Sequence, residues 1–121
     1  MMNILGIMLG GGIGALLRFA LMQFCTKFNP DNKHIGTFVV NVLGSFALGY
    51  LYACSSGHCS FLYKTIVIGV IASFTTFSTY EFDNLTLLAG QRYREFFRYA
   101  FGSCVLCLLF LYLGIICASL K

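Results

Sequence analysis

The fold of this chain is decided by the stretch Ser73-Phe74-Thr75-Thr76-Phe77-Ser78-Thr79-Tyr80, in which Ser and Thr hydroxyls alternate with aromatic rings inside an otherwise apolar segment. A helix in a bilayer has no water to satisfy stray polar groups, so polarity at that depth normally faces a partner or a pore. The stretch therefore predicts a small integral membrane protein whose third span carries a path for an ion or a small solute.

The composition supports the membrane class. The chain has 121 residues, of which 59% are hydrophobic and only 10% are charged, whereas a soluble domain carries about 25% charged residues. This length allows one domain, which we expect to span residues 1–121. The net charge of +4 comes from cations scattered near the segment ends, so we expect no nucleic-acid partner.

Four segments are apolar enough to cross a bilayer, which needs roughly 20 residues per helix. We expect these helices at about 3–25, 36–55, 61–88 and 96–118. Because the number is even, both termini should lie on one side of the membrane. The first apolar run is too long, and lacks the basic flank, for a cleavable signal peptide.

Cations are unequally divided between the two sides. The side opposite the termini is expected to hold five of them and the side of the termini two, which weakly favours a cytoplasmic location for the former. The five are Lys27, Lys33, Arg92, Arg94 and Arg98, and the two are Lys64 and Lys121.

Three of the spans carry small or polar residues at intervals of four, which places them on one helix face. Small residues predict a packing seam between helices. Arg18 either finds a partner or water, or extends to the nearer interface. Asn41 is either a bond between helices or a donor directed into a pore. The three series are Gly6, Gly10, Gly14 and Arg18; Thr37, Asn41, Ser45 and Gly49; and Tyr99, Ser103 and Cys107.

The third span is longer than one crossing requires. Ser and Thr side chains can replace backbone hydrogen bonds, so the hydroxyl run permits a break in this helix. A break exposes carbonyls at the end of one half-helix, a negative pole that suits a cation. Glu81 and Asp83 follow the break, and either could be an interfacial charge or reach the membrane interior.

The six cysteines lie mostly within or beside apolar helices, where Cys behaves as a small hydrophobic residue. Cys104 and Cys107 are one helical turn apart in the last span. Packing is the expected role of this pair, with redox or metal chemistry as the alternative.

The motifs together resemble the Fluc (CrcB) family of fluoride channels over nearly the whole chain. Gly10–Arg18 resembles the family's first-helix signature, and Gly36–Phe46 resembles the second. Thr75–Thr79 is similar to the third-helix break, and Tyr99-x-x-x-Ser103 is similar to the fourth-helix polar track.

This resemblance implies an all-α integral membrane fold of four transmembrane helices with a broken third helix, assembled as an antiparallel, dual-topology homodimer. It implies passive export of fluoride through two pores at the dimer interface, in a bacterial inner (plasma) membrane and without enzymatic activity. The implied partners are fluoride, a second copy of the chain and the lipid bilayer.

The resemblance also implies site residues. A structural Na⁺ at the dimer centre would be held by the backbone carbonyls of Ala72 and Thr75. The fluoride pathway would contain Asn41, Phe77, Tyr80, Tyr99, Ser103, Thr37 and Arg18.

Four positions depart from the family pattern. Ala72 replaces a glycine, Tyr80 a phenylalanine, Asp83 a glutamate and Cys107 a hydroxyl residue.

Fluoride is small and strongly hydrated, so its pore must supply close N–H and O–H donors, and aromatic ring edges can add positive potential.

Two other classes have four membrane helices. A small multidrug-resistance-type transporter needs a carboxylate in its first span, where this chain has Arg18 instead. A membrane thiol oxidoreductase needs cysteine pairs near one membrane face, whereas Cys104 and Cys107 are expected deep in the last span. A non-conducting assembly subunit would leave the hydroxyl run without a purpose.

Overall fold

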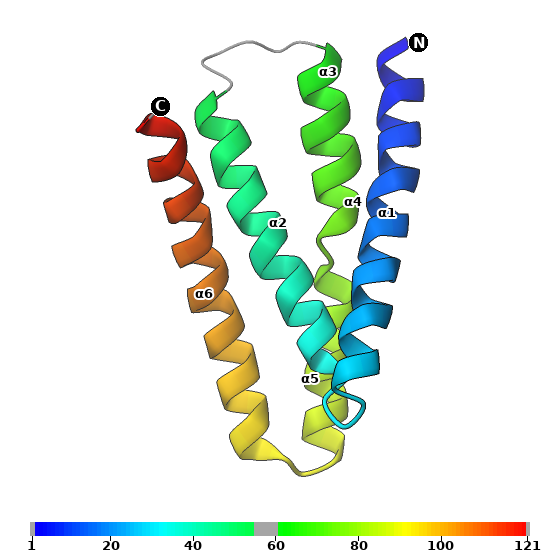
Figure 1. Cartoon of the computed structure of the whole chain (residues 1–121). Helices are drawn as coiled ribbons and strands as arrows, with labels where there is room; N and C mark the ends of the chain where they lie inside the picture. The colour runs from blue at the N-terminus through cyan, green and yellow to red at the C-terminus, as the bar shows by residue number, and fades with distance from the viewer. Residues whose placement is uncertain (1, 55–60, 121) are drawn as a thin grey trace.

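The chain folds into a sheaf of long helices (Figure 1). The computed structural model describes residues 2–54 and 61–120. Four helical spans in this part of the chain are long and apolar enough to cross a membrane: Ile4–Phe28, His34–Cys54, Thr65–Ala89 and Tyr93–Ser119. The expectation of an all-helical membrane protein with four spans is confirmed.

The first, second and fourth spans are single helices. They are α1 (Met2–Phe28), α2 (His34–Cys54) and α6 (Tyr93–Ser119). Both α1 and α6 are about a turn longer than the ranges 3–25 and 96–118 expected from hydropathy. The extra residues are polar or aromatic at the ends near the connectors, where a hydropathy window falls before the helix does.

The third span consists of several pieces. It begins with α3 (Phe61–Lys64), continues as a π-helical segment η1 (Thr65–Ile71) and the short α4 (Ala72–Phe74), and resumes as α5 (Phe77–Ala89). Between α4 and α5, Thr75 has φ −71° and ψ 152°, and Thr76 has φ −144° and ψ 122°, both extended.

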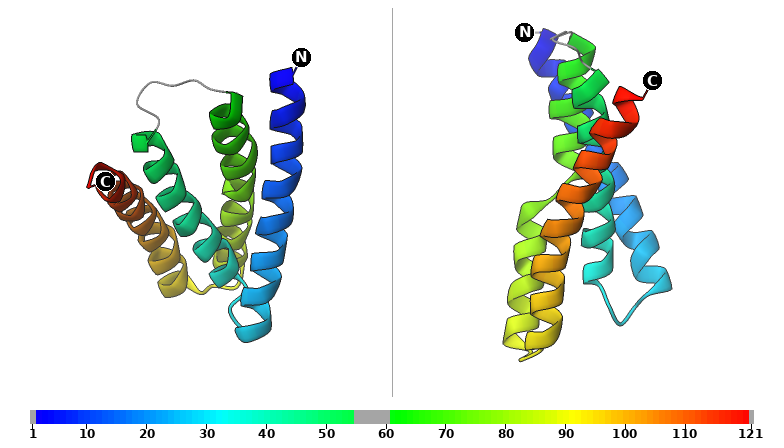
Figure 2. Two further views of the ribbon diagram at one scale, coloured as in Figure 1. Left: turned by 45° about the horizontal axis from the view of Figure 1, so that its top comes forward. Right: turned by 90° about the vertical axis from the view of Figure 1, so that its left-hand side faces the viewer.

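The third span also changes its packing partner at this point. The segments α3, η1 and α4 pack on α1, whereas α5 packs on α6 and α2. Figure 2 shows α5 and α6 side by side below the change and α3 near α1 above it. The two extended residues therefore lie where the span passes from one neighbour to the other.

Close approach of the helices depends on glycine. A Cβ added at Gly14 would lie 2.2 Å from the carbonyl oxygen of Val70 in η1. A Cβ added at Gly49 of α2 would lie 2.1 Å from the carbonyl oxygen of Leu111 in α6. Both distances are shorter than any real contact, so the small residues serve as packing seams in both helix pairs.

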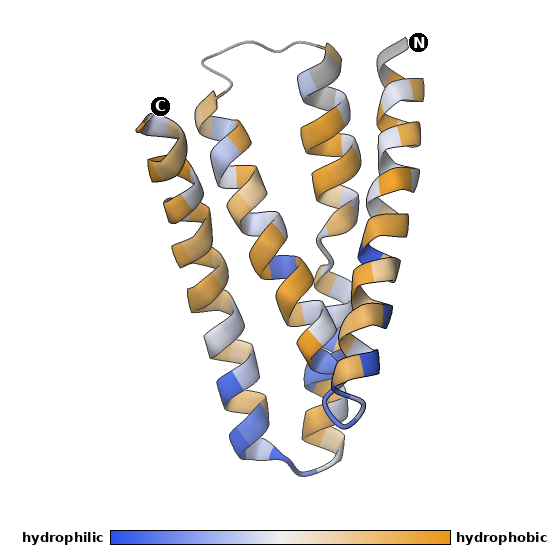
Figure 3. Ribbon diagram, in the orientation of Figure 1, coloured by the Kyte–Doolittle hydropathy of each residue, from blue (hydrophilic) through white to orange (hydrophobic). Residues whose placement is uncertain are grey.

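The polar groups of the described chain gather at one end of the sheaf, opposite both termini (Figure 3). The connector after α5 lies there, with Gln91 at φ 54° and an ion pair between Arg92 and Glu95. Along the rest of the sheaf many large apolar side chains are exposed, including Leu9, Leu16 and Leu108. In a membrane these side chains meet lipid or another subunit rather than water.

Candidate functional site: a pocket beside the extended residues of the third span

The site begins with a pair of hydrogen bonds between Asn41 and the backbone of Thr76. The Asn41 Nδ2 group donates to the Thr76 carbonyl oxygen at 2.9 Å, and the Thr76 N–H donates to Asn41 Oδ1 at 2.8 Å. Both polar groups of a non-helical residue are thus satisfied by one side chain. Because Thr76 is only 6% exposed, this pairing removes the cost of leaving its backbone unsatisfied in an apolar setting.

Thr76 also starts α5. Its Oγ1 accepts a hydrogen bond from the Thr79 N–H at 3.3 Å and lies 3.0 Å from the Thr79 hydroxyl. This is the usual N-cap arrangement, in which a Ser or Thr oxygen satisfies an N–H of the first helical turn.

Two carbonyl groups lose their helical partners as a result. In a continuous helix the Ala72 carbonyl would accept from the Thr76 N–H, which here donates to Asn41. The Thr75 carbonyl would accept from the Thr79 N–H, which here donates to Thr76 Oγ1. The Thr75 hydroxyl gives Ala72 only a long contact of 3.4 Å. Both carbonyl oxygens are therefore available to another ligand.

A pocket of about 310 Å³ opens beside these residues, between α2, the start of α5 and α6. Five residues predicted for the site line it, and they come from three separate spans. They are Asn41, Thr75, Phe77, Tyr80 and Ser103. Its other lining residues are Gly44, Ser45, Leu48, Thr76, Cys104 and Cys107. We call this space the inner pocket.

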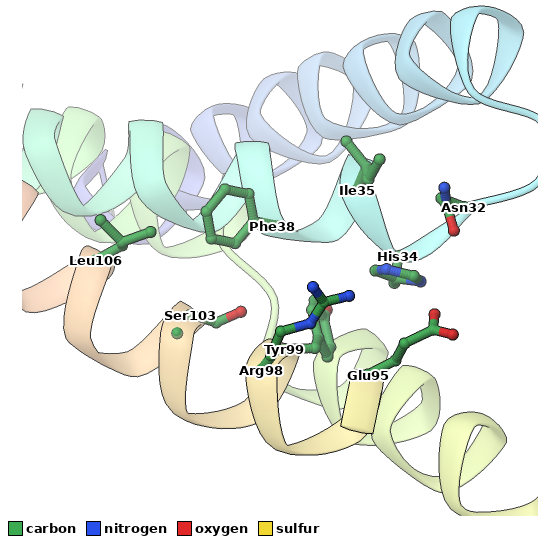
Figure 4. A pocket seen from close by; sticks show the side chains of 10 residues that line it. Asn32, His34, Ile35, Phe38, Glu95, Arg98, Tyr99, Ser103 and Leu106 are labelled. Atoms are coloured by element: carbon green, nitrogen blue, oxygen red, sulfur yellow. The ribbon is translucent and has the colours of Figure 1, made fainter. Parts of the chain in front are cut away.

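A second pocket of about 340 Å³ lies between α2 and α6, toward the polar end of the sheaf (Figure 4). Tyr99 and Ser103 belong to it, together with His34, Glu95 and Arg98. The His34 ring meets the Tyr99 ring edge to face, with centroids 5.1 Å apart. We call this space the outer pocket. Ser103 lines both pockets, so it stands at their junction.

The tyrosine hydroxyls near the pockets already have acceptors. The Tyr80 hydroxyl donates to the Ala100 carbonyl at 3.0 Å, and the Tyr99 hydroxyl donates to Asp83 Oδ2 at 3.2 Å. The hydroxyl that distinguishes Tyr80 from phenylalanine is thus bonded to α6. Asp83 is a partner of the fourth span rather than an isolated charge.

Three buried hydroxyls, those of Thr37, Thr65 and Ser103, lack a hydrogen-bond partner among the described residues, and two of them were predicted for the site. Ser103 is 5% exposed and Thr37 is fully buried, and neither side-chain oxygen has a hydrogen-bond partner. A buried hydroxyl without a partner carries a free-energy cost of about 1–3 kcal/mol. Such groups are candidates for contacts with a bound solute.

Of the other predicted residues, Arg18, Thr37, Ala72 and Tyr99 do not line the inner pocket. Arg18 is a half-buried residue of α1 and lines neither pocket. The Phe77 ring, although it borders the inner pocket, is 73% exposed in the single chain. Sequence reasoning missed His34 and Ala100, because a lone histidine at a helix start and a backbone carbonyl give no motif.

The fold and this site define a small multi-pass membrane protein with two pockets between its helices. A family model described as "CrcB-like protein, Camphor Resistance (CrcB)" matches residues 5–115. The chain belongs to this family, as its motifs predicted.

Relatives named "Fluoride-specific ion channel FluC" match along almost their whole length. One from Campylobacter lari is 37% identical over 93% of both chains, and one from Campylobacter jejuni is 41% identical over 88% of this chain and 89% of its own. One from Phocaeicola vulgatus is 39% identical over 95% of this chain and 97% of its own. These names describe a channel rather than an enzyme.

Proposed function

We propose that this chain forms a fluoride-selective channel that lets fluoride leave the cytoplasm passively across a bacterial inner membrane. Its path would run from the outer pocket, past Ser103, into the inner pocket. The observation that carries the proposal is the buried Ser103 hydroxyl, which has no hydrogen-bond partner in the described part of the chain and borders both pockets. Membership of a family whose relatives carry the name of fluoride channels supports the same conclusion.

The residues near this path suit a small anion. Fluoride is strongly hydrated, so a path must replace its water with close donors. Ser103 has a hydroxyl hydrogen not engaged with a described residue. Asn41 Nδ2 carries two N–H groups, of which the contact to Thr76 needs one. The rings of Phe77 and Tyr80 lie 5.9 Å apart between centroids and can present positively polarised edges.

The path would work in an antiparallel homodimer with two pores at its interface. The 73% exposure of Phe77 supports this arrangement, because an exposed aromatic ring that borders the inner pocket is well placed to be covered by a second copy. The many exposed apolar side chains of the sheaf leave room for both lipid and a partner. The remaining pathway residue, Arg18, would act near the pore entrance rather than inside the pocket.

A structural Na⁺ would bind at the extended residues of the third span. The carbonyls of Ala72 and Thr75 fit this role, because the N–H groups that would bond them in a helix are directed to Asn41 and to Thr76 Oγ1. Carbonyl oxygens are hard ligands suited to such a cation. When bound, the ion would neutralise the dipoles of these carbonyls at the centre of the dimer.

Efflux from liposomes tests the function. Purified protein is reconstituted with internal fluoride and chloride, and both ions are followed with selective electrodes. We expect rapid fluoride release without chloride release. Slow or unselective release from a correctly folded protein would refute the proposal.

A matched pair of variants tests the role of the Ser103 hydroxyl. Ser103→Ala removes the shared donor, so fluoride efflux should fall by about tenfold if one hydrogen bond of about 1.4 kcal/mol is lost from the path. The control is Ser119→Ala on the same helix. The Ser119 hydroxyl donates to the Ile116 carbonyl, so this variant should conduct like the parent. Equal efflux from both variants would remove Ser103 from the path.

A further inference from the structure

Two cysteines line the inner pocket beside the proposed fluoride path. Cys104 and Cys107 belong to α6, and both are free thiols. Residues three apart on a helix are neighbours, with Cβ atoms about 5–6 Å apart. The two sulfur atoms can therefore reach one ion placed between them. The proposed fluoride path does not use either thiol as a hydrogen-bond donor.

The surroundings of the two thiols favour a bound solute. Cys104 Sγ lies 3.7 Å from the Tyr80 hydroxyl. Ser103 borders the same pocket, and its buried hydroxyl has no partner among the described residues. The pocket volume of about 310 Å³ leaves ample room for an ion. A thiol pair and an unsatisfied hydroxyl thus share one space.

The number and type of ligands select the ion. No group of three or more His, Cys, Asp or Glu side chains suited to a metal occurs in residues 2–54 and 61–120. A structural Zn²⁺ site needs four such ligands, so the pocket does not supply one. Thiolates are soft ligands that select Cu⁺ over hard cations. Two of them are sufficient for Cu⁺ and Ag⁺, which form stable complexes with two sulfur ligands.

We propose that Cys104 and Cys107 form a two-sulfur binding site for a soft monovalent cation of the Cu⁺ and Ag⁺ class within the inner pocket. Each coordinating thiol releases its proton as the sulfur–metal bond forms, and no electron is transferred. The bound ion occupies the space between the thiols and Ser103. Binding therefore blocks passage through the pocket, a consequence that rests on the proposed channel function, although the binding itself does not.

The test uses a protein in which these are the only thiols. The variant Cys25→Ala/Cys54→Ala/Cys59→Ala/Cys117→Ala keeps Cys104 and Cys107. Silver nitrate in chloride-free buffer is the probe, and native mass spectrometry counts the ions bound. We expect one Ag⁺ per chain, lost when Cys104→Ala or Cys107→Ala is added. Fluoride efflux should fall to the level of protein-free liposomes with Ag⁺ and recover with excess dithiothreitol.

Three results would refute the proposed binding site at Cys104 and Cys107. The first is no Ag⁺ bound by the four-alanine variant, and the second is unchanged binding after both remaining cysteines are replaced. If the four-alanine variant does not fold, the parent is compared with Cys104→Ala/Cys107→Ala, and equal ion counts are the third.

Full fluoride efflux with Ag⁺ bound would refute the proposed block of the channel. A protein that binds Ag⁺ but conducts no fluoride even in the absence of Ag⁺ would support the binding site and refute the channel function.

Discussion

Replacing Asn41 by alanine removes both hydrogen bonds that satisfy the backbone of Thr76. The Thr76 N–H is then unpaired at a residue that is 6% exposed, whereas the Thr76 carbonyl, at the N-cap of α5, still accepts the first hydrogen bond of that helix. One buried unsatisfied group costs about 1–3 kcal/mol, so the variant should lose about 1–3 kcal/mol of unfolding free energy. Water admitted to the inner pocket would bring the loss toward the lower end of this range.

The assay is unfolding in mixed micelles by a denaturing detergent, monitored by loss of helical circular dichroism. Ser45→Ala is the control, because Ser45 lies one turn along α2 and lines the same pocket but does not bond Thr76. It should change the free energy by no more than about 0.5 kcal/mol. A similarly small effect of Asn41→Ala would refute the view that this side chain holds the extended residues in place.

Asn41→Asp separates stability from conduction. The carboxylate keeps an acceptor for the Thr76 N–H but has no donor for the Thr76 carbonyl. Its negative charge would stand in the proposed anion path, so fluoride efflux should fall to background. Unchanged efflux would exclude Asn41 from the path.

Two further substitutions test the ring and the helix seam. Phe77→Leu should slow fluoride efflux by about two- to tenfold, the equivalent of an aromatic edge contact of about 0.5–1.5 kcal/mol, whereas Phe82→Leu, an exposed residue of the same helix, should leave it unchanged. Gly49→Ala forces a Cβ against the Leu111 carbonyl and should cost about 1–3 kcal/mol of unfolding free energy. Gly12→Ala has open space around it and should be neutral or stabilising, so equal effects of the two alanines would count against the seam.

The number and type of the spans could be predicted from sequence because hydropathy alone determines which segments can cross a bilayer. The glycine series of the first span was also correctly predicted as a seam, since small residues four apart leave one helix face flat. Gly14 indeed packs against the backbone of Val70.

The bonding around the third span could be predicted only in part. The hydroxyl run indicated that side chains satisfy backbone groups there, but not that Asn41 bonds both groups of Thr76. That pairing depends on a contact between residues 35 apart in sequence, which no local pattern specifies. The same holds for Tyr80, whose hydroxyl finds the Ala100 carbonyl only once α5 and α6 are side by side.

The change of neighbour along the third span gives its two halves different main packing partners. The first half, α3, η1 and α4, packs mainly on α1, and the second half, α5, packs on α6 and α2, while α2 also contacts α1, η1 and α4. The only covalent link between the two halves is the extended pair Thr75 and Thr76. We expect a shift of α4 along the glycine seam of α1 to displace the Thr75 carbonyl beside the inner pocket. Substitutions in the first helix should then alter the geometry of the proposed ion path.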